Sequence, residues 1–258
     1  MRYPANAFTH AIAAKQKQVG IWVSLSSAFA AEVVAPAGFD WALLDMEHTP
    51  SDYFTVTGQM QAFAATQTTA IVRPEWNDPV VVKRLLDMGA RGLLFPMIQS
   101  VEEAEKAVAS TRYPPHGTRG ISGSTRATGF GRITDYTDRI NDEMTVIIQL
   151  ETAHAISLAE EIAAVDGVDG IFFGPGDIAA DIGKLGKPLD PAVWDLVMPA
   201  ARKLMDKGVP VGTLVMDPDF AANLLNDGFT FVACGQDTSL LAKATDAALA
   251  TVKAQINT

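Results

Sequence analysis

Cysteine is nearly absent from this 258-residue sequence, which contains Cys234 alone. No intramolecular disulfide can form, so we expect a reducing compartment, the cytoplasm. Apolar runs long enough to cross a membrane (about 18 residues) are also missing. The N-terminus lacks the charged and apolar regions of a signal peptide, so we expect neither a membrane span nor a secretory leader.

Positive charge is in the minority. Lys and Arg contribute 20 residues against 30 Asp and Glu, for a formal net charge of −10. Such a surface repels phosphate backbones and anionic lipids, so we expect no nucleic acid and no membrane as the main partner. Anionic small molecules stay open as ligands, because a local arginine and a bound cation can reverse the field inside a pocket.

The apolar residues, 48% of the chain, fall into alternating runs of strand and helix character. The strand-like runs lie at residues 19–25, 40–44, 69–72, 92–96, 145–150, 170–173, 210–214 and 229–234. The helical patterns lie at residues 28–35, 52–65, 79–88, 101–110, 155–164, 191–207, 217–226 and 239–255. Eight such units predict a closed (β/α)8 TIM barrel forming one domain, 1–258, with an extra N-terminal helix over 7–18 and a long C-terminal helix.

An open, doubly wound sheet is the main rival fold, but no GxGxxG motif follows the first strand. One long segment, residues 113–135, has no regular pattern and is rich in Gly, Ser, Thr, Arg and Pro. Long segments of this kind are often functional. It could fold over the barrel mouth as a lid, or form a flexible surface insertion.

The strand predicted at residues 145–150 ends in polar side chains. Gln149 and Glu151 are two residues apart, so they point to the same face, and an acid there is costly to bury without a partner. Asp177 follows the next strand after a glycine-rich turn, and active sites of such barrels form where strands end. The two acids predict a site for Mg²⁺ or Mn²⁺, with Co²⁺ as a further option. Helix capping is the alternative role for both acids.

Two more polar groups follow strands at the same end. Arg73 comes directly after an apolar strand, so it would be partly buried and should face an anion. His48 ends the segment Asp45-Met46-Glu47-His48, and histidine is suited to move a proton near neutral pH. A surface-loop histidine is the alternative. No lysine lies at a strand end, so we do not expect a Schiff-base mechanism.

These residue types suit the chemistry of 2-oxo acids. A 2-oxo acid can chelate a divalent cation, which stabilises the enolate that forms next to the carbonyl. Arg73 would add charge stabilisation at the same oxygen. The backbone N–H groups of Gly176 and Asp177, at a turn that opens a helix, would hold the carboxylate. A non-catalytic metabolite-binding barrel is a rival of a different class, which would tolerate loss of the histidine or the acids.

Longer motifs carry a family resemblance. They are Phe39-Asp40-Trp41, Leu44-Asp45-Met46-Glu47-His48, Val72-Arg73-Pro74, Asn77-Asp78-Pro79, Lys83-Arg84-Leu85-Leu86-Asp87-Met88-Gly89-Ala90, Pro96-Met97-Ile98, Arg112-Tyr113-Pro114-Pro115, Gln149-Leu150-Glu151-Thr152, Gly167-Val168-Asp169-Gly170 and Gly174-Pro175-Gly176-Asp177-Ile178. With these motifs the chain resembles the HpcH/HpaI family of metal-dependent pyruvate aldolases over nearly its whole length.

The resemblance implies a class II aldolase that reversibly cleaves a 4-hydroxy-2-oxo acid to pyruvate and an aldehyde. By position it makes His48 the base, Arg73 the enolate-stabilising arginine, and Glu151 and Asp177 the metal ligands. Asp87 matches an acid that raises the basicity of the histidine. Because Asp87 ends a helix near the opposite face of the barrel, it would act across a subunit contact or indirectly. The family also suggests a homo-oligomer, a hexamer.

The resemblance further assigns substrate-binding positions, which are Trp22, Gln149, Gly176, Asp177 and Leu214. Gly176-Asp177-Ile178-Ala179 departs from the usual family pattern of a small residue followed by Asp-Leu-Ser, and glycine there loosens the turn. Residues 120–127 look closer to the branch that cleaves 2-dehydro-3-deoxyglucarate than to the 4-hydroxy-2-oxoheptanedioate branch. Arg126 could then bind a distal carboxylate, or it could simply anchor its loop.

Two related activities remain open. One is an aldolase of the same family that uses hydroxypyruvate. The other is a lyase of the citrate-lyase β-subunit type, which handles CoA thioesters. The CoA phosphates would call for a basic patch, and this acidic chain shows no obvious one.

Overall fold

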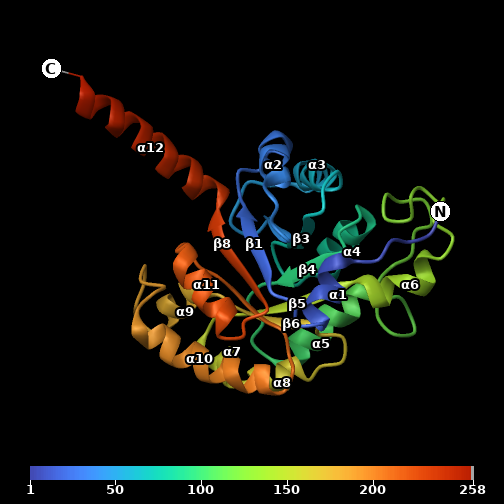
Figure 1. Ribbon diagram of the computed structural model, residues 1–258. Coiled ribbons are helices and arrows are strands. Elements are labelled where there is room, and N and C mark those ends of the chain that lie inside the picture. The colour runs from blue at the N-terminus through green and yellow to red at the C-terminus, as the bar shows by residue number, and fades with distance from the viewer. Residues whose placement is uncertain (257–258) are drawn as a thin grey trace.

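Eight parallel strands close into a barrel in chain order, which confirms the predicted TIM barrel (Figure 1). The computed structural model describes residues 1–256, so residues 257–258 of the predicted domain lie outside the described part. The strands are β1 (Gln18–Val23), β2 (Trp41–Asp45), β3 (Thr69–Arg73), β4 (Gly92–Phe95), β5 (Thr145–Leu150), β6 (Gly170–Phe173), β7 (Val211–Leu214) and β8 (Phe231–Gln236).

Helices surround the barrel. They are α1 (Ala7–Ala13), α2 (Ala28–Val34), the 3-10 turn η1 (Ala35–Ala37), α3 (Tyr53–Phe63), α4 (Pro79–Asp87), α5 (Val101–Thr111), α6 (Tyr136–Glu143), α7 (Ala153–Ser157), α8 (Ala159–Ala163), α9 (Pro175–Asp181), α10 (Pro191–Asp206), α11 (Pro218–Asn226) and α12 (Asp237–Gln255). Side-chain caps start several of them: Asp78 accepts from the N–H groups of Val80 and Val81 at the start of α4.

The helical predictions differ from the structure where the helices are short. The helix expected over 7–18 ends at Ala13, and the one expected over 155–164 is two five-residue helices, α7 and α8. Helix α6 was not predicted, and α9 was expected only as a helix opened by the turn at Gly176 and Asp177, without bounds. Helix α9 has only seven residues, which is too short to show a clear helical period.

The inside of the barrel is filled by large side chains that are accommodated by glycines on neighbouring strands. Trp41 and Phe231 are fully buried. A Cβ atom at Gly20 would lie 2.2 Å from the Trp41 ring, and one at Gly212 would lie 2.2 Å from the Phe231 ring. Phe8 of α1 packs against both rings, at 5.6 and 5.8 Å between centroids, so α1 covers the amino end of the barrel.

The long segment 113–135 lies away from the barrel mouth, so of the two alternatives the lid is not formed within a single copy of the chain. Arg119 bonds to Asp87 at the end of α4, and the N–H of Ala127 bonds to the Asp87 carbonyl at 3.1 Å. The N–H of Thr134 bonds to the carbonyl of Met1. A helix that follows a barrel strand runs back toward the amino end, so these anchors hold the segment at that end.

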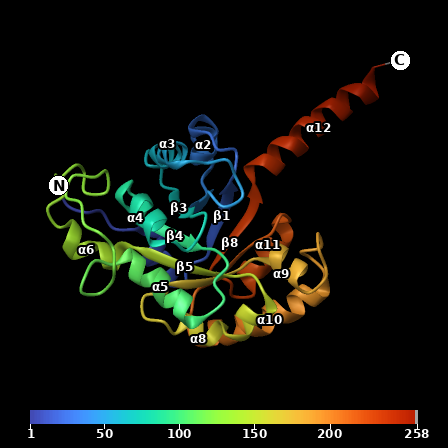
Figure 2. The same cartoon turned by 180° about the vertical axis from the view of Figure 1, so that it is seen from behind.

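Helix α12 projects from the barrel after β8, and Figures 1 and 2 show it extending away from the other elements. Of its 19 residues only Asp237, at its start, is buried. It carries exposed apolar side chains along its length: Leu240, Leu241, Leu249 and Val252. Within the part of the chain that the structure describes, no helix combines the length and apolar character that a membrane crossing needs.

The carboxyl group of Asp169, which does not line the pocket at the barrel mouth, should make the stability of the fold depend on pH. Asp169 accepts a hydrogen bond from the N–H of Val146 at 2.7 Å, and burial raises the pKa of Asp169 to about 6. The unfolded chain releases this proton near pH ~4. Between these values the folded state binds more protons than the unfolded state, so this group makes stability fall as pH rises.

We therefore expect Asp169→Asn to be more stable than the parent at pH 7, by roughly 1–2 kcal/mol, and to lose this decline between about pH 4 and 6. Asparagine keeps an acceptor for Val146 and carries no charge. Urea unfolding across this pH range measures the effect. Asp166→Asn is the matched control, because Asp166 is 97% exposed and should change stability little. Equal profiles for Asp169→Asn and the parent would contradict the prediction.

Candidate active site

A pocket of about 360 Å³ opens at the carboxyl ends of the strands. It is the place where such barrels carry their active sites. The structure brings eight of the predicted site residues to its walls: Trp22, His48, Arg73, Gln149, Glu151, Gly176, Asp177 and Leu214. Two predicted site residues, Asp87 and Arg126, lie elsewhere.

Arg73 is held in the pocket by two carboxylates. Its Nε and Nη2 atoms donate to Asp45 at 2.9 and 2.8 Å, and its Nη1 atom lies 2.8 Å from an oxygen of Glu47. Only 5% of Arg73 is exposed, so the expectation that it faces an anion is confirmed, with two anions in place of one. Burial acts to raise the pKa of Asp45, but the hydrogen bonds and charge of Arg73 outweigh it and lower that pKa.

Asp45 and Glu47 were not predicted as site residues, although a signal was present. Asp45 is the last residue of β2 and Glu47 follows it by two residues. The register pairs Asp45 with Arg73 on β3. Neighbouring strands of a parallel barrel end side by side. That rule makes these two acids candidate ion-pair partners of Arg73.

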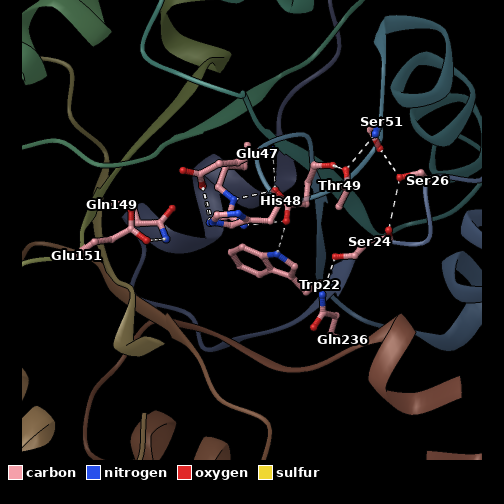
Figure 3. A network of polar contacts seen from close by, with 12 residues as sticks. Trp22, Ser24, Ser26, Glu47, His48, Thr49, Ser51, Gln149, Glu151 and Gln236 are labelled. Atoms are coloured by element: carbon pink, nitrogen blue, oxygen red, sulfur yellow. Dashed lines mark hydrogen bonds and ion pairs between the residues drawn. The ribbon is translucent and has the colours of Figure 1, made fainter. Parts of the chain in front are cut away.

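Gln149 of β5 and Glu151, which directly follows this strand, lie side by side (Figure 3). Gln149 donates from Nε2 to Glu151 at 2.8 Å, and the N–H of Met97 donates to the other Glu151 oxygen at 2.9 Å. Glu151 is 1% exposed. Burial, together with the charges of Asp177 and Glu47, raises the pKa of Glu151 to about 8.

Asp177 faces this acid from the first turn of α9. The turn comes close: a Cβ atom at Gly174 would lie 2.8 Å from the Glu151 carboxylate. Proline at the first position of α9 and glycine at the second leave the backbone N–H groups of the turn without partners in the helix.

The acids fit a divalent cation. Glu47, Glu151 and Asp177 act on one another as like charges, and Gln149 Oε1 is buried without a hydrogen-bond partner. A cation would relieve that repulsion and accept oxygen donors. Among residues 1–256, no group of three or more His, Cys, Asp or Glu side chains is arranged to hold a metal alone. Glu151 and Asp177 would therefore supply two ligands of the cation, and the substrate and water would supply the others.

His48 stands at the rim of the pocket, beside Glu47 (Figure 3). Its Nε2 atom lies 3.8 Å from a Glu47 oxygen, and 65% of its side chain is exposed. Its turn is shaped by Thr49, whose hydroxyl donates to the carbonyl of Asp45 at 2.6 Å. The imidazole can therefore reach both substrate and solvent.

Trp22 and Leu214 are apolar parts of the pocket wall. The Trp22 indole N–H donates to Asp45 at 3.3 Å, and its ring stacks on Phe172 at 5.6 Å between centroids. The guanidinium of Arg73 lies 5.0 Å from the centre of the Trp22 ring. The indole therefore helps to hold the arginine and closes one side of the pocket.

Asp87 and Arg126 are not part of this pocket. Asp87 pairs with Arg119 at 3.2 Å, at the amino end of the barrel. Arg126 donates to the carbonyl of Met88 at 2.8 Å and lines a separate hollow beside α3. Within one copy of the chain, neither reaches His48 or the acids.

A closed barrel that gathers acids, an arginine and a histidine in a pocket at its strand ends is a (β/α)8-barrel enzyme. The family model of the HpcH/HpaI aldolase/citrate lyase family matches residues 18–244. The chain belongs to that family.

Named relatives are consistent with this family assignment. The chain is 47% identical over 247 residues to a pyruvate aldolase of Rhizobium etli, covering 96% of this chain and 97% of the relative. It is 45% identical over 251 residues to a 4-hydroxy-2-oxo-heptane-1,7-dioate aldolase of Shigella sonnei, covering 97% and 96%. A crystal structure of a family member from Burkholderia cenocepacia superposes with a TM-score of 0.93 at 38% identity, covering 96% and 100%. The chain is a carbon–carbon lyase of the class II aldolase kind.

Proposed function

We propose that the enzyme reversibly cleaves a 4-hydroxy-2-oxo acid into pyruvate and an aldehyde. The observation that carries the proposal is the meeting of Arg73, His48 and the two acids Glu151 and Asp177 in one pocket. This set supplies positive charge for an oxygen that becomes negative, a group to move a proton, and a site for a cation. A wall of Trp22 and Leu214 limits the size of the substrate.

The chain's own residues account for the proton and charge movements. In cleavage, His48 takes the proton of the C4 hydroxyl, the C3–C4 bond breaks, and the aldehyde leaves. The electron pair passes to C3 and the C2 oxygen as the pyruvate enolate, which regains a proton at C3. The Nε and Nη2 atoms of Arg73 donate to Asp45 and its Nη1 atom forms an ion pair with Glu47, and its other N–H donors would bind that oxygen.

Glu151 and Asp177 would hold a divalent cation, Mg²⁺ or Mn²⁺, with Co²⁺ also suited to such oxygen ligands. When bound, the cation supplies a Lewis acid for the keto group of the 2-oxo acid. The N–H groups of Gly176 and Asp177 and the amide of Gln149 would orient the substrate carboxylate. Members of this family are generally metal-dependent.

We also propose a homo-oligomer, which the family resemblance suggests is a hexamer. The exposed apolar side chains on α12 support an assembly, because such a surface is commonly covered by a partner. A direct role of Asp87 or Arg126 in a pocket would also require an assembly. Both lie at the amino end of the barrel, so direct contact would be with the pocket of a neighbouring copy.

The proposal is tested by pyruvate release from 2-dehydro-3-deoxyglucarate and from 4-hydroxy-2-oxoheptanedioate, with and without EDTA. We expect EDTA to lower release by at least ~100-fold and Mg²⁺ or Mn²⁺ to restore it. The better substrate identifies the branch. Activity that EDTA does not change would exclude the cation mechanism. If neither substrate releases pyruvate, the proposed donor is wrong, and hydroxypyruvate is the next to test.

A further inference from the structure

One polar side chain interrupts the apolar wall of the pocket. Gln236, the last residue of β8, lines the pocket together with Leu214, Val215 and Met216. In a closed barrel of eight strands, β8 and β1 stand across from β4 and β5. Gln236 therefore faces the pocket from the side opposite Glu151, where the carbons beyond C3 of a bound 2-oxo acid would lie.

The Gln236 amide is held in a fixed orientation. Its Nε2 atom donates to the hydroxyl of Ser24 at 2.8 Å (Figure 3). The backbone N–H of Ser24 donates to Asp237 at 2.8 Å. The next residues of this loop continue the contacts, with Ser26 and Ser51 hydroxyls 2.8 Å apart. Among the described residues, the carbonyl oxygen of the Gln236 side chain has no partner. An amide anchored at one end presents the other end to a ligand.

We propose that Gln236 selects aldehydes that carry a hydroxyl group beside the carbonyl, by accepting a hydrogen bond from that hydroxyl. The inference rests on the proposed aldolase function and specifies the aldehyde half of its substrate. An alkyl aldehyde would leave the amide unpaired, which disfavours it.

Glycolaldehyde and propanal test the inference, because they have nearly the same shape and differ by a hydroxyl in place of a methyl group. The aldol addition of pyruvate is measured for each aldehyde, in the parent enzyme and in Gln236→Leu. The preference is the ratio of the two kcat/KM values. Comparing this ratio between the two enzymes cancels the intrinsic reactivity of the aldehydes.

We expect Gln236→Leu to lower the preference for glycolaldehyde by about tenfold, through a higher KM for glycolaldehyde. Ser24→Ala keeps the amide and removes its anchor, and should lower the preference by about threefold. This second variant also reports if Gln236→Leu fails to fold. Gln67→Leu is the control, because Gln67 is exposed at the far end of the barrel and should leave the preference unchanged.

Deuterium exchange into the methyl group of pyruvate, without any aldehyde, separates the two levels of the proposal. Exchange that persists in Gln236→Leu and Ser24→Ala while the preference stays at the parent value would overturn the role of Gln236 alone. Absence of exchange in the parent enzyme with Mg²⁺ or Mn²⁺ present would overturn the aldolase function, and the inference with it. Normal exchange with a reduced preference in both variants is the expected result.

Discussion

Glu151→Gln is expected to reduce kcat/KM for pyruvate release by ~10³-fold or more, while the protein stays folded. Glutamine has the same shape but is a poor ligand for a divalent cation, and the Lewis acid supplies several kcal/mol of transition-state stabilisation. The hydrogen bonds can survive. The new amide oxygen can accept from Met97, and its N–H can donate to Gln149 Oε1, which has no partner in the parent.

Thermal unfolding with and without Mn²⁺ provides the second measurement for this variant. Cation binding to the folded state should raise the Tm of the parent and leave that of Glu151→Gln unchanged. The variant without metal should be at least as stable as the parent, because it no longer buries a carboxylate whose pKa is raised to about 8. Glu161→Gln, an exposed site on α8, is the matched control. A variant that keeps both the activity and the Mn²⁺ response would remove Glu151 from the cation site.

Arg73→Lys is expected to lower kcat by about 10²- to 10³-fold and to weaken the fold as well. Lysine keeps the charge, but a single ammonium cannot reproduce the paired contacts to Asp45 together with the contact to Glu47. Two buried carboxylates would be left incompletely compensated. Breaking such a pair costs about 2–4 kcal/mol of unfolding free energy, which urea titration can measure.

The two effects of Arg73→Lys can be separated by a second substitution. Adding Asp45→Asn removes the carboxylate that lost its paired donors, so stability should partly return. Activity should not return, since the N–H donors for the substrate oxygen are still missing. Arg202→Lys, at an exposed position of α10, is the control for an arginine change without buried partners. Recovery of both properties in the double variant would show that Arg73 acts only on the fold.

Much of the barrel could be predicted because each strand is recognisable from the residues of its own stretch of sequence. The apolar runs at β5 and β6 gave those strands with their correct bounds, since buried parallel strands are almost continuously apolar. The bounds of short elements such as α9 could not be predicted, because seven residues carry little periodicity. The position of segment 113–135 could not be predicted either. It depends on hydrogen bonds to Asp87 and Met1, which no local sequence pattern indicates.

For the candidate site, individual residues could be predicted from the sequence, but their partners could not. Glu151 and Arg73 were recognisable because a charge directly at the end of an apolar strand requires a partner. The partners of Arg73 were not recognisable, because they depend on the register of β2 against β3. Gln236 gave no signal at all in the sequence. A neutral amide at a strand end becomes informative only once the walls around it are known to be apolar.

The pairing of glycines with aromatic rings inside the barrel limits how this enzyme can be altered. In each pair the ring fills the space that a side chain at the glycine would need. The pairs are Gly20 with Trp41 and Gly212 with Phe231. Any side chain added at either glycine overlaps a ring, and a smaller residue in place of the ring leaves a void. An evolving lineage must therefore cross an unstable intermediate to exchange the members of a pair. Libraries meant to reshape the barrel interior should randomise both positions of a pair at once, because single-site libraries contain only the unstable halves.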